Sequence, residues 1–239
     1  METMNSGSYD FDRMAFQEKE IEMLKRQARK AAVFDRMIWR ETGFKKGMRV
    51  LDLGCGPGNI SVELARDNPT GQVTGIDASR NLIDRANAYK KAEQIENLDF
   101  AVADLYELEN MDKKYDFVYS RFVFQHLQEP VTALEKLKVV LNPGAIICIV
   151  DIDDQWFTLY PEPLKLAPFL KKSAGHQESL GGDRFVGRKL SAYLSKACFN
   201  DVRTGIKILD SNHLGINDFL DLTILSRAAV FDDADAQLY

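Results

Sequence analysis

The chain has 239 residues, of which 45% are hydrophobic, and a formal net charge of −5. This length and apolar content suit one α/β domain with additions, or two small domains, and argue against a disordered protein. The mild acidity supplies no basic surface for a phosphate backbone, so we expect no nucleic-acid partner. No apolar run reaches the length of a membrane span. The polar residues 1–13 do not resemble a signal peptide, and the three cysteines lack paired spacing, so we expect a cytoplasmic protein.

The first half of the chain alternates predicted helices and strands. Apolar side chains at helical spacing predict a helix over residues 15–41, with Gly43 as its stop. A buried strand over 49–53 and a helix over 59–66 follow. A second apolar run over 72–77 predicts a strand, after which Ser79 caps a helix that extends to about residue 91.

Three more strands follow in the same pattern. They are predicted over 98–103, 115–119 and 145–150, with a helix over 131–141 that the turn Asn142-Pro143-Gly144 ends. Each strand is almost continuously hydrophobic, which is typical of strands buried on both faces. The sequence therefore predicts an α/β, Rossmann-like fold, with a mostly parallel sheet and helices on both of its faces.

The pattern changes after Asp151. Residues 152–185 are rich in aromatic side chains and prolines, which indicates a cap insertion rather than a crossover helix. A helix over 186–197, a sixth strand over 202–209 and a helix over 215–230 are predicted beyond it. We therefore divide the chain into an N-terminal helical lid (1–45), a Rossmann-like core (46–151), the cap insertion (152–185) and the C-terminal part of the core (186–239).

The loop after the first strand is the most informative motif. The strand carries Asp52 near its end and opens into Gly54-Cys55-Gly56-Pro57-Gly58. Alternate glycines permit a sharp turn and the close approach of a ligand. Dinucleotide folds use the spacing G-x-G-x-x-G, whereas this loop has G-x-G-x-G, and Asp52 would repel a pyrophosphate. S-adenosylmethionine (SAM), which carries an ammonium and a sulfonium group and no phosphate, fits this loop better.

Acidic residues also follow the next two strands. Because the carboxyl ends of parallel strands meet at one edge of the sheet, we expect Asp52, Asp77 and Asp104 to lie near one ligand. Asp77 can accept both ribose hydroxyls. Asp104 can accept the adenine amine while Leu105 packs on the ring. Asp52 can orient the loop and the methionine ammonium, directly or through water.

In this combination, the chain resembles a class I SAM-dependent methyltransferase of the small-molecule type, similar to the enzymes of ubiquinone and menaquinone biosynthesis. The resemblance covers about residues 46–151. It implies a seven-stranded sheet, although no seventh strand is evident in the sequence. It also implies that the glycine loop holds the methionine portion, that Ser120 and Arg121 line the sulfonium side, and that Tyr9 folds over the cofactor. The predicted cofactor-binding residues are Tyr9, Asp52, Gly54, Cys55, Gly56, Asp77, Ala78, Asp104, Leu105, Ser120 and Arg121.

The sequence identifies no catalytic residue. His126 could act as a general base, but a scaffold role beside the cofactor is favoured. Asp151 is a weak candidate to orient or deprotonate an acceptor. Together with Asp153 and Asp154 it could hold Mg²⁺, but a solvated or helix-capping loop is favoured, so no metal is predicted. In the cap, we expect at least one aromatic side chain to wall the acceptor pocket; the candidates are Trp156, Phe157, Tyr160 and Phe169.

These observations predict a SAM-dependent methyltransferase. It would transfer a methyl group to oxygen, nitrogen or carbon of a small, partly hydrophobic metabolite by in-line displacement, with S-adenosyl-L-homocysteine (SAH) as product. The alternatives are a catalytically silent SAM-binding protein, an NAD-dependent oxidoreductase and an aminopropyl transferase. The exposed aromatic cap could also support a homo-oligomer. The acceptor stays open, because fold-level likeness does not name a substrate.

Overall fold

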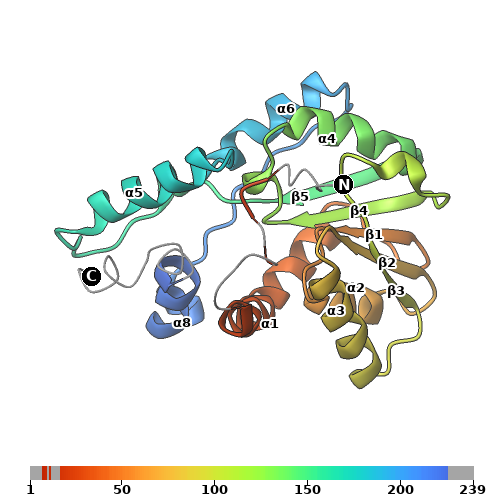
Figure 1. Ribbon diagram of the computed structural model, residues 1–239, viewed down its shortest axis with the longest axis horizontal. Helices are drawn as coiled ribbons and strands as arrows, with labels where there is room; N and C mark the ends of the chain where they lie inside the picture. The colour runs from red at the N-terminus through yellow and green to blue at the C-terminus, as the bar shows by residue number, and fades with distance from the viewer. Residues whose placement is uncertain (1–6, 10, 12–16, 226–239) are drawn as a thin grey trace.

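The computed structural model describes residues 7–9, 11 and 17–225. Its centre is a parallel sheet of five strands in the order β3-β2-β1-β4-β5 (Figure 1). The strands are β1 (Arg49–Leu53), β2 (Gln72–Asp77), β3 (Leu98–Val102), β4 (Tyr115–Arg121) and β5 (Leu141–Val150). The strand order reverses between β1 and β4. In open α/β sheets, ligands bind at the carboxyl ends of the strands beside such a reversal.

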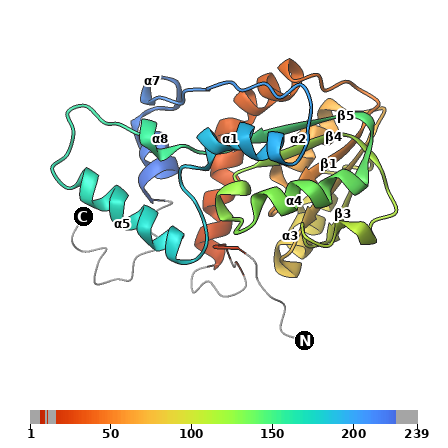
Figure 2. The same ribbon diagram turned by 90° about the horizontal axis from the view of Figure 1, so that it is seen from above.

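Helices cover both faces of this sheet, which confirms the predicted fold class (Figures 1 and 2). On one face lie α1 (Gln17–Glu41), α2 (Asn59–Asp67) and α3 (Arg80–Ala92). On the other lie α4 (Pro130–Leu137) and α6 (Leu190–Lys196). As predicted, Ser79 caps α3, because its side chain accepts the backbone N–H of Leu82. Short 3₁₀ turns connect these elements: η2 (Leu108–Asn110), η3 (Phe124–His126), η4 (Lys138–Val140), η5 (Asp154–Trp156) and η6 (Val186–Lys189).

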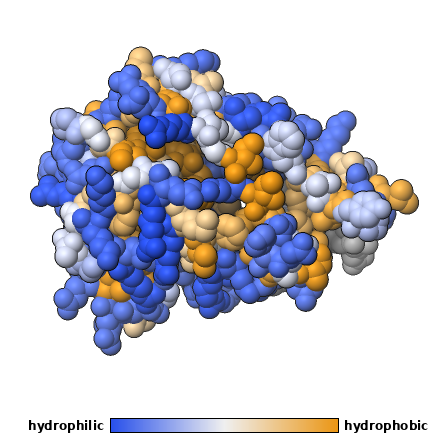
Figure 3. Space-filling model, turned by 180° about the vertical axis from the view of Figure 1, so that it is seen from behind, coloured by the Kyte–Doolittle hydropathy of each residue, from blue (hydrophilic) through white to orange (hydrophobic). Residues whose placement is uncertain are grey.

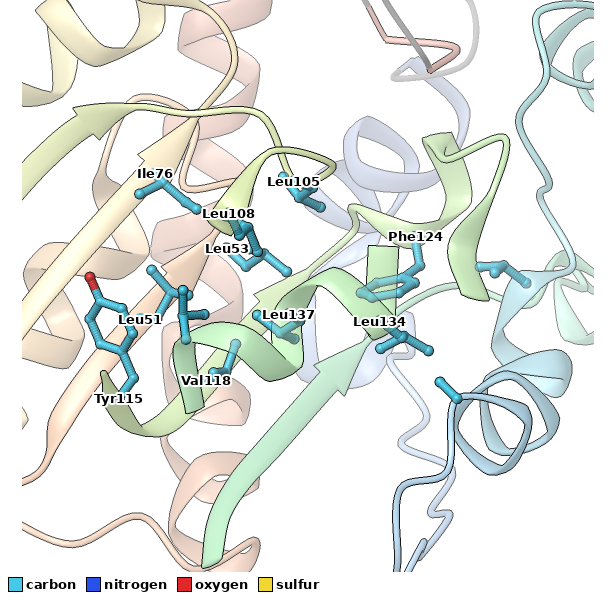
Figure 4. Close-up of a cluster of buried hydrophobic side chains, with 13 residues drawn as sticks. Leu51, Leu53, Ile76, Leu105, Leu108, Tyr115, Val118, Phe124, Leu134 and Leu137 are labelled. Atoms are coloured by element: carbon cyan, nitrogen blue, oxygen red, sulfur yellow. The ribbon is translucent and has the colours of Figure 1, made fainter. Parts of the chain in front are cut away.

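Each face of the sheet has its own hydrophobic core, because successive side chains of a strand point to opposite faces. Leu51 and Leu53 of β1 pack with Leu134 and Leu137 of α4 (Figure 4). Val50, which precedes Leu51 in sequence, belongs to the second core, under α1 and α2. In that second core the ring of Trp39 meets the ring of Tyr119 edge-on, with centroids 5.5 Å apart. The sheet is thus buried on both sides, which explains its nearly continuous hydrophobic strands.

The predicted boundary between the fourth helix and the fifth strand was wrong. The helix α4 ends at Leu137, and β5 begins at Leu141, before the predicted turn at residues 142–144. This turn lies inside β5 as an irregularity in the pairing with β4, since Tyr115 pairs with Leu141 but Phe117 pairs with Ile146. Gly144 has a φ of +79°, which glycine adopts at low cost, and it permits this bulge.

The predicted sixth strand over 202–209 was also wrong. These residues form no strand or helix, and the side chains of Ile206 and Ile208 are 73% and 75% exposed. The chain continues into α7 (Ser211–Leu214), α8 (Ile216–Leu220) and a π-helical turn, η7 (Asp221–Leu225). These elements lie along α1, where Lys30 pairs with Asp218. The helix predicted over 215–230 is therefore present up to residue 225, and its remainder lies outside the described residues. Within the described chain the sheet has five strands, so neither a sixth nor a seventh strand is present there.

The cap insertion contains one helix, α5 (Leu166–Ser179), which projects from the body of the molecule (Figure 1). Phe169 of α5 is buried, and Phe157 stacks on Phe219 of α8 with ring centroids 6.0 Å apart. Figure 3 shows apolar side chains gathered in the middle of the rear face and towards its α5 end. Among the described residues, we find no helix with the length and apolar character that a membrane span requires.

Candidate active site

The glycine loop connects β1 to α2 in a conformation that needs its glycines. Gly54, Gly56 and Gly58 have φ angles of +69°, +54° and +82°. A side chain at Gly54 would collide with Val123, and one at Gly58 would come within 2.6 Å of the Phe100 ring. At Gly56, by contrast, a Cβ would meet no atom within 4 Å. The loop is therefore packed at both ends and open at its centre, where a ligand can approach the backbone.

Asp52 lies beneath this loop and is almost fully buried. The Ser61 hydroxyl of α2 donates a hydrogen bond to its Oδ2 at 2.5 Å. Burial raises the pKa of Asp52 to about 7; the Ser61 hydrogen bond opposes the shift, while the carboxylates of Asp35 and Asp77 add to it. Asp52 thus ties β1 to the first turn of α2, as expected of a residue that orients the loop.

Asp77 lies at the carboxyl end of β2 and holds the loop from the other side. Its Oδ2 accepts the backbone N–H of Gly56 at 2.9 Å, and its Oδ1 accepts that of Ser79 at 3.0 Å. The next residue, Ala78, is exposed. Cys55 donates its backbone N–H to the Ile76 carbonyl at 2.9 Å, and burial raises the pKa of its thiol well above the ordinary range. The structure therefore brings the predicted residues of β1 and β2 together around Gly56.

The third acid, Asp104, follows β3. Its Oδ1 accepts the backbone N–H of Tyr106 at 2.9 Å, which fixes the turn. Leu105 is buried in the core beneath α4, as Figure 4 shows. Its contact with an adenine ring therefore remains a prediction.

At the end of β4, Arg121 pairs with an acid that sequence reasoning missed. Its Nε lies 3.3 Å from Oδ1 of Asp35, a residue of α1, and the Tyr119 hydroxyl donates to the same oxygen at 2.6 Å. Asp35 is only 2% exposed. The sequence pattern could have indicated that Asp35 is buried, because Asp35 falls on the buried stripe of α1 between Ala28 and Trp39. The neighbouring Ser120 is buried, and its hydroxyl has no partner among the described residues.

The N-terminal residues 7–9 cover this edge of the sheet. The Tyr9 hydroxyl donates to Oε1 of Glu20 at 3.1 Å, and the Tyr9 ring lies 5.2 Å from the His126 ring, measured between centroids. Burial raises the pKa of Tyr9 strongly, and the charges of Glu20 and Asp77 add to this shift, which places Tyr9 near the tip of β2. These contacts place Tyr9 beside His126 and near Asp77, and its role as a lid residue stays a prediction.

His126 lies between the N-terminal residues and the cap. Its Nδ1 is 2.9 Å from the Ser8 hydroxyl and 3.5 Å from the Gln177 side-chain amide. Burial lowers its pKa to about 3, and the charge of Arg184 adds to this. A neutral, weakly basic ring with these contacts agrees better with the scaffold role than with general base catalysis.

The three acids after β5 all make contacts within the protein. Asp151 accepts backbone N–H groups from Gln125 at 3.2 Å and from Ile152 at 2.9 Å. Burial raises its pKa to about 7. Asp153 caps η5 and pairs with Arg188 at 2.8 Å, and Asp154 pairs with Arg184 at 2.5 Å. This geometry matches the favoured interpretation, a capping loop, and makes Asp151 an anchor of the β4–α4 connection.

The aromatic residues of the cap do not converge on the edge of the sheet that carries the glycine loop. Trp156 and Tyr160 are 71% and 101% exposed, and Phe169 is buried within the cap. A wall for the acceptor, formed by one of these rings, remains a prediction.

An open parallel sheet with an acid-flanked glycine loop at its β1–β4 reversal defines a Rossmann-like methyltransferase fold. A family model described as a methyltransferase domain matches residues 44–191. The chain therefore belongs to the methyltransferase-domain family, and SAM is the methyl donor that this membership implies.

Two curated relatives are named methyltransferases, and one solved structure shows the same fold. An uncharacterized methyltransferase of Schizosaccharomyces pombe is 32% identical over 179 residues, 67% of this chain and 64% of the relative. Demethylmenaquinone methyltransferase of Staphylococcus aureus is 31% identical over 119 residues, 49% of this chain and 48% of that protein. The chain thus spans 64% and 48% of the length of these two relatives. A SAM-dependent methyltransferase from Aquifex aeolicus shares the fold, with a TM-score of 0.55, 24% identity and coverage of 72% of this chain and 80% of that one.

Proposed function

We propose that this protein transfers a methyl group from SAM to oxygen, nitrogen or carbon of a small, partly hydrophobic acceptor. The observation that carries the proposal is the arrangement around Gly56. A backbone with open space beside it lies between the buried carboxylate of Asp52 and the strand-end carboxylate of Asp77. Such a site favours a cationic ligand and disfavours a pyrophosphate. The name of the Staphylococcus aureus relative, demethylmenaquinone methyltransferase, supports a small acceptor.

The donor supplies an electrophilic methyl group on a sulfonium, so the acceptor atom attacks in line while the carbon–sulfur bond breaks and SAH leaves. An acceptor that carries a proton on the attacking atom releases it to solvent, and no proton moves at the methyl carbon itself. The protein therefore contributes mainly by positioning the two reactants and excluding water from the reacting atoms. The glycine loop and Asp77 would orient the donor. Tyr9 and Glu20, at the start of the N-terminal cover, would exclude water from it.

Ligand binding tests the donor assignment. We expect SAH to raise the melting temperature of the protein and NAD to leave it unchanged. Asp77→Asn should weaken SAH binding by roughly 10- to 100-fold, because a charged acceptor at the ribose position is lost. The matched control is Asp99→Asn, which changes an exposed acid of the neighbouring strand. Stabilisation by NAD alone would contradict the proposal and favour the oxidoreductase.

A transfer assay separates the enzyme from the catalytically silent binding protein. Protein incubated with SAM carrying a labelled methyl group and a panel of phenols, quinols and amines should produce SAH in proportion to labelled product. SAH binding without transfer to any member of a broad panel would favour the silent alternative.

A further inference from the structure

Asp35, Tyr119 and Arg121 form a buried polar group behind the glycine loop. The Asp35 Oδ1 atom accepts from the Tyr119 hydroxyl at 2.6 Å and lies 3.3 Å from Nε of Arg121. Two elements far apart in sequence, α1 and β4, meet in this group. The guanidinium carbon of Arg121 also lies 4.3 Å from the centroid of the Phe122 ring, so the plane of the side chain is held by a second contact.

The pairing of the strands places Arg121 close to the loop. Ser120 of β4 pairs with Leu53 of β1, so Arg121 is level with Gly54, the first loop glycine. The charge of Arg121 also acts on Asp52 beneath the loop. Arg121 therefore places a positive charge close to the segment expected to hold the methionine portion of the donor.

The contacts of Arg121 leave part of its guanidinium available. The printed contact between Arg121 and Asp35 is made by Nε, and the two terminal Nη atoms donate no hydrogen bond to the described residues. The side chain is 11% exposed. Two parallel N–H donors on a fixed plane match the two oxygens of a carboxylate.

Stability alone explains this group poorly. The second oxygen of Asp35, Oδ2, is buried and accepts no hydrogen bond from the described residues. A buried ion pair with an unsatisfied oxygen carries a desolvation penalty that its Coulomb attraction does not reliably repay. A positioning role gives a reason for keeping such a pair on the inner face of α1.

We propose that Asp35 is a positioning residue that fixes the Arg121 guanidinium so that its terminal nitrogens bind the carboxylate of the donor's methionine portion. This inference rests on the proposed function, because it requires SAM as the donor. It gives α1 an indirect part in donor recognition: the helix would not only cover the site but also set the orientation of Arg121.

The test compares SAH with its decarboxylated analogue, which keeps the adenosine, thioether and amine. The wild-type protein should bind SAH roughly 10- to 100-fold more tightly than the analogue by calorimetric titration, and Arg121→Gln should reduce this preference to less than about threefold. If the wild-type protein binds both ligands equally, the inference is overturned and the proposed function stands. If it binds neither, the proposed function itself fails.

Two further variants isolate the positioning role. Asp35→Asn and Tyr119→Phe should each lower the preference for SAH several-fold and leave the affinity for the analogue nearly unchanged. Glu63→Gln is the matched control, since it removes an acid that pairs with the neighbouring Arg36 away from the loop and should keep the full preference. If Asp35→Asn does not fold, Tyr119→Phe decides the question. Unchanged preference in a folded variant of either residue would overturn the role of Asp35.

Discussion

We call the glycine loop and the acids at the strand ends the donor edge, and residues 7–9 together with the cap insertion the cover. These two regions are held together in different ways. At the donor edge, side chains bond to backbone groups nearby in the fold: Asp77 accepts from Gly56 and Ser79, and Asp104 from Tyr106. The cover depends on contacts between side chains far apart in sequence, such as Arg184 with Asp154 and Phe157 with Phe219. The first arrangement is fixed by the sheet, whereas the second depends on contacts between segments outside the sheet. Under the proposed function, donor binding and acceptor choice would therefore change independently.

The largest expected effect on stability comes from a substitution in the core of the sheet rather than in the cover. Leu134→Ala, in the core beneath α4, should lower the free energy of unfolding by about 2–5 kcal/mol, because it leaves a cavity in a fully buried cluster. Urea unfolding measures this. The control, Val139→Ala, changes a residue that is 40% exposed and should lower the free energy of unfolding much less. A loss below about 1 kcal/mol for Leu134→Ala would show that the core is more loosely packed than the structure implies.

The next effect concerns the buried acid under the loop. In the unfolded chain Asp52 ionises near its ordinary pKa of 3.8, and in the folded protein near 7. Between pH 3.8 and about 7, Asp52 is protonated in the folded protein and ionised in the unfolded chain. Asp52 therefore makes the free energy of unfolding fall as the pH rises. Asp52→Asn removes that fall and should stabilise the ligand-free protein at pH 8 by about 1–4 kcal/mol relative to the wild type.

The wild type and Asp52→Asn are compared at each pH, because Asp151 titrates over the same pH range as Asp52 and does so in both proteins. We expect the stability difference to be small at pH 4 and to grow up to pH 8 in denaturant titrations. SAH binding should weaken in Asp52→Asn, since a carboxylate near the methionine ammonium is lost. A difference that does not vary with pH would contradict the raised pKa of Asp52.

A smaller effect tests the contact between the cover and the donor edge. Tyr9→Phe removes the hydroxyl that bonds to Glu20 but keeps the ring beside His126. We expect a loss of about 0.5–1.5 kcal/mol in SAH binding, seen mainly as faster dissociation in stopped-flow measurements. An unchanged dissociation rate would place Tyr9 outside the lid.

The smallest effect lies at the surface of the cap. Trp156→Ala and Tyr160→Ala should each change the free energy of unfolding by less than about 0.5 kcal/mol, because both side chains are exposed. If either ring walls the acceptor pocket, its loss should instead change the preference among acceptors in the transfer assay. Unchanged stability together with unchanged acceptor choice for both variants would remove them from the proposed pocket.

The donor edge was readable from the sequence because each element carries a local signal. Alternate glycines predicted the loop, acids predicted the strand ends, and Ser79 predicted a helix cap, all of which the structure contains. Asp35 was missed because its partners, Tyr119 and Arg121, lie more than eighty residues away. The helical pattern of α1 shows that position 35 is buried, but not what it meets.

The regions after β5 were harder to predict for a physical reason. Residues 202–209 are rich in β-branched side chains as a strand would be, yet they pair with no strand and expose Ile206 and Ile208. Strand propensity describes a side chain that fits a pleated surface, and it cannot supply the neighbouring strand. Likewise, the turn at residues 142–144 was read as a helix end because a bulge inside a strand uses the same residues.

The edge of the sheet at β5 has one further consequence, for the behaviour of the protein at high concentration. Within the described chain β5 pairs with β4 alone, so the other side of a ten-residue strand carries no partner strand. Pro143 lacks an N–H and interrupts the beginning of that edge, which confines any template for strand addition to the final residues, 146–150. Self-association through these residues would need no unfolding of either core. It would bring a foreign backbone next to Asp151, which anchors the connection between β4 and α4.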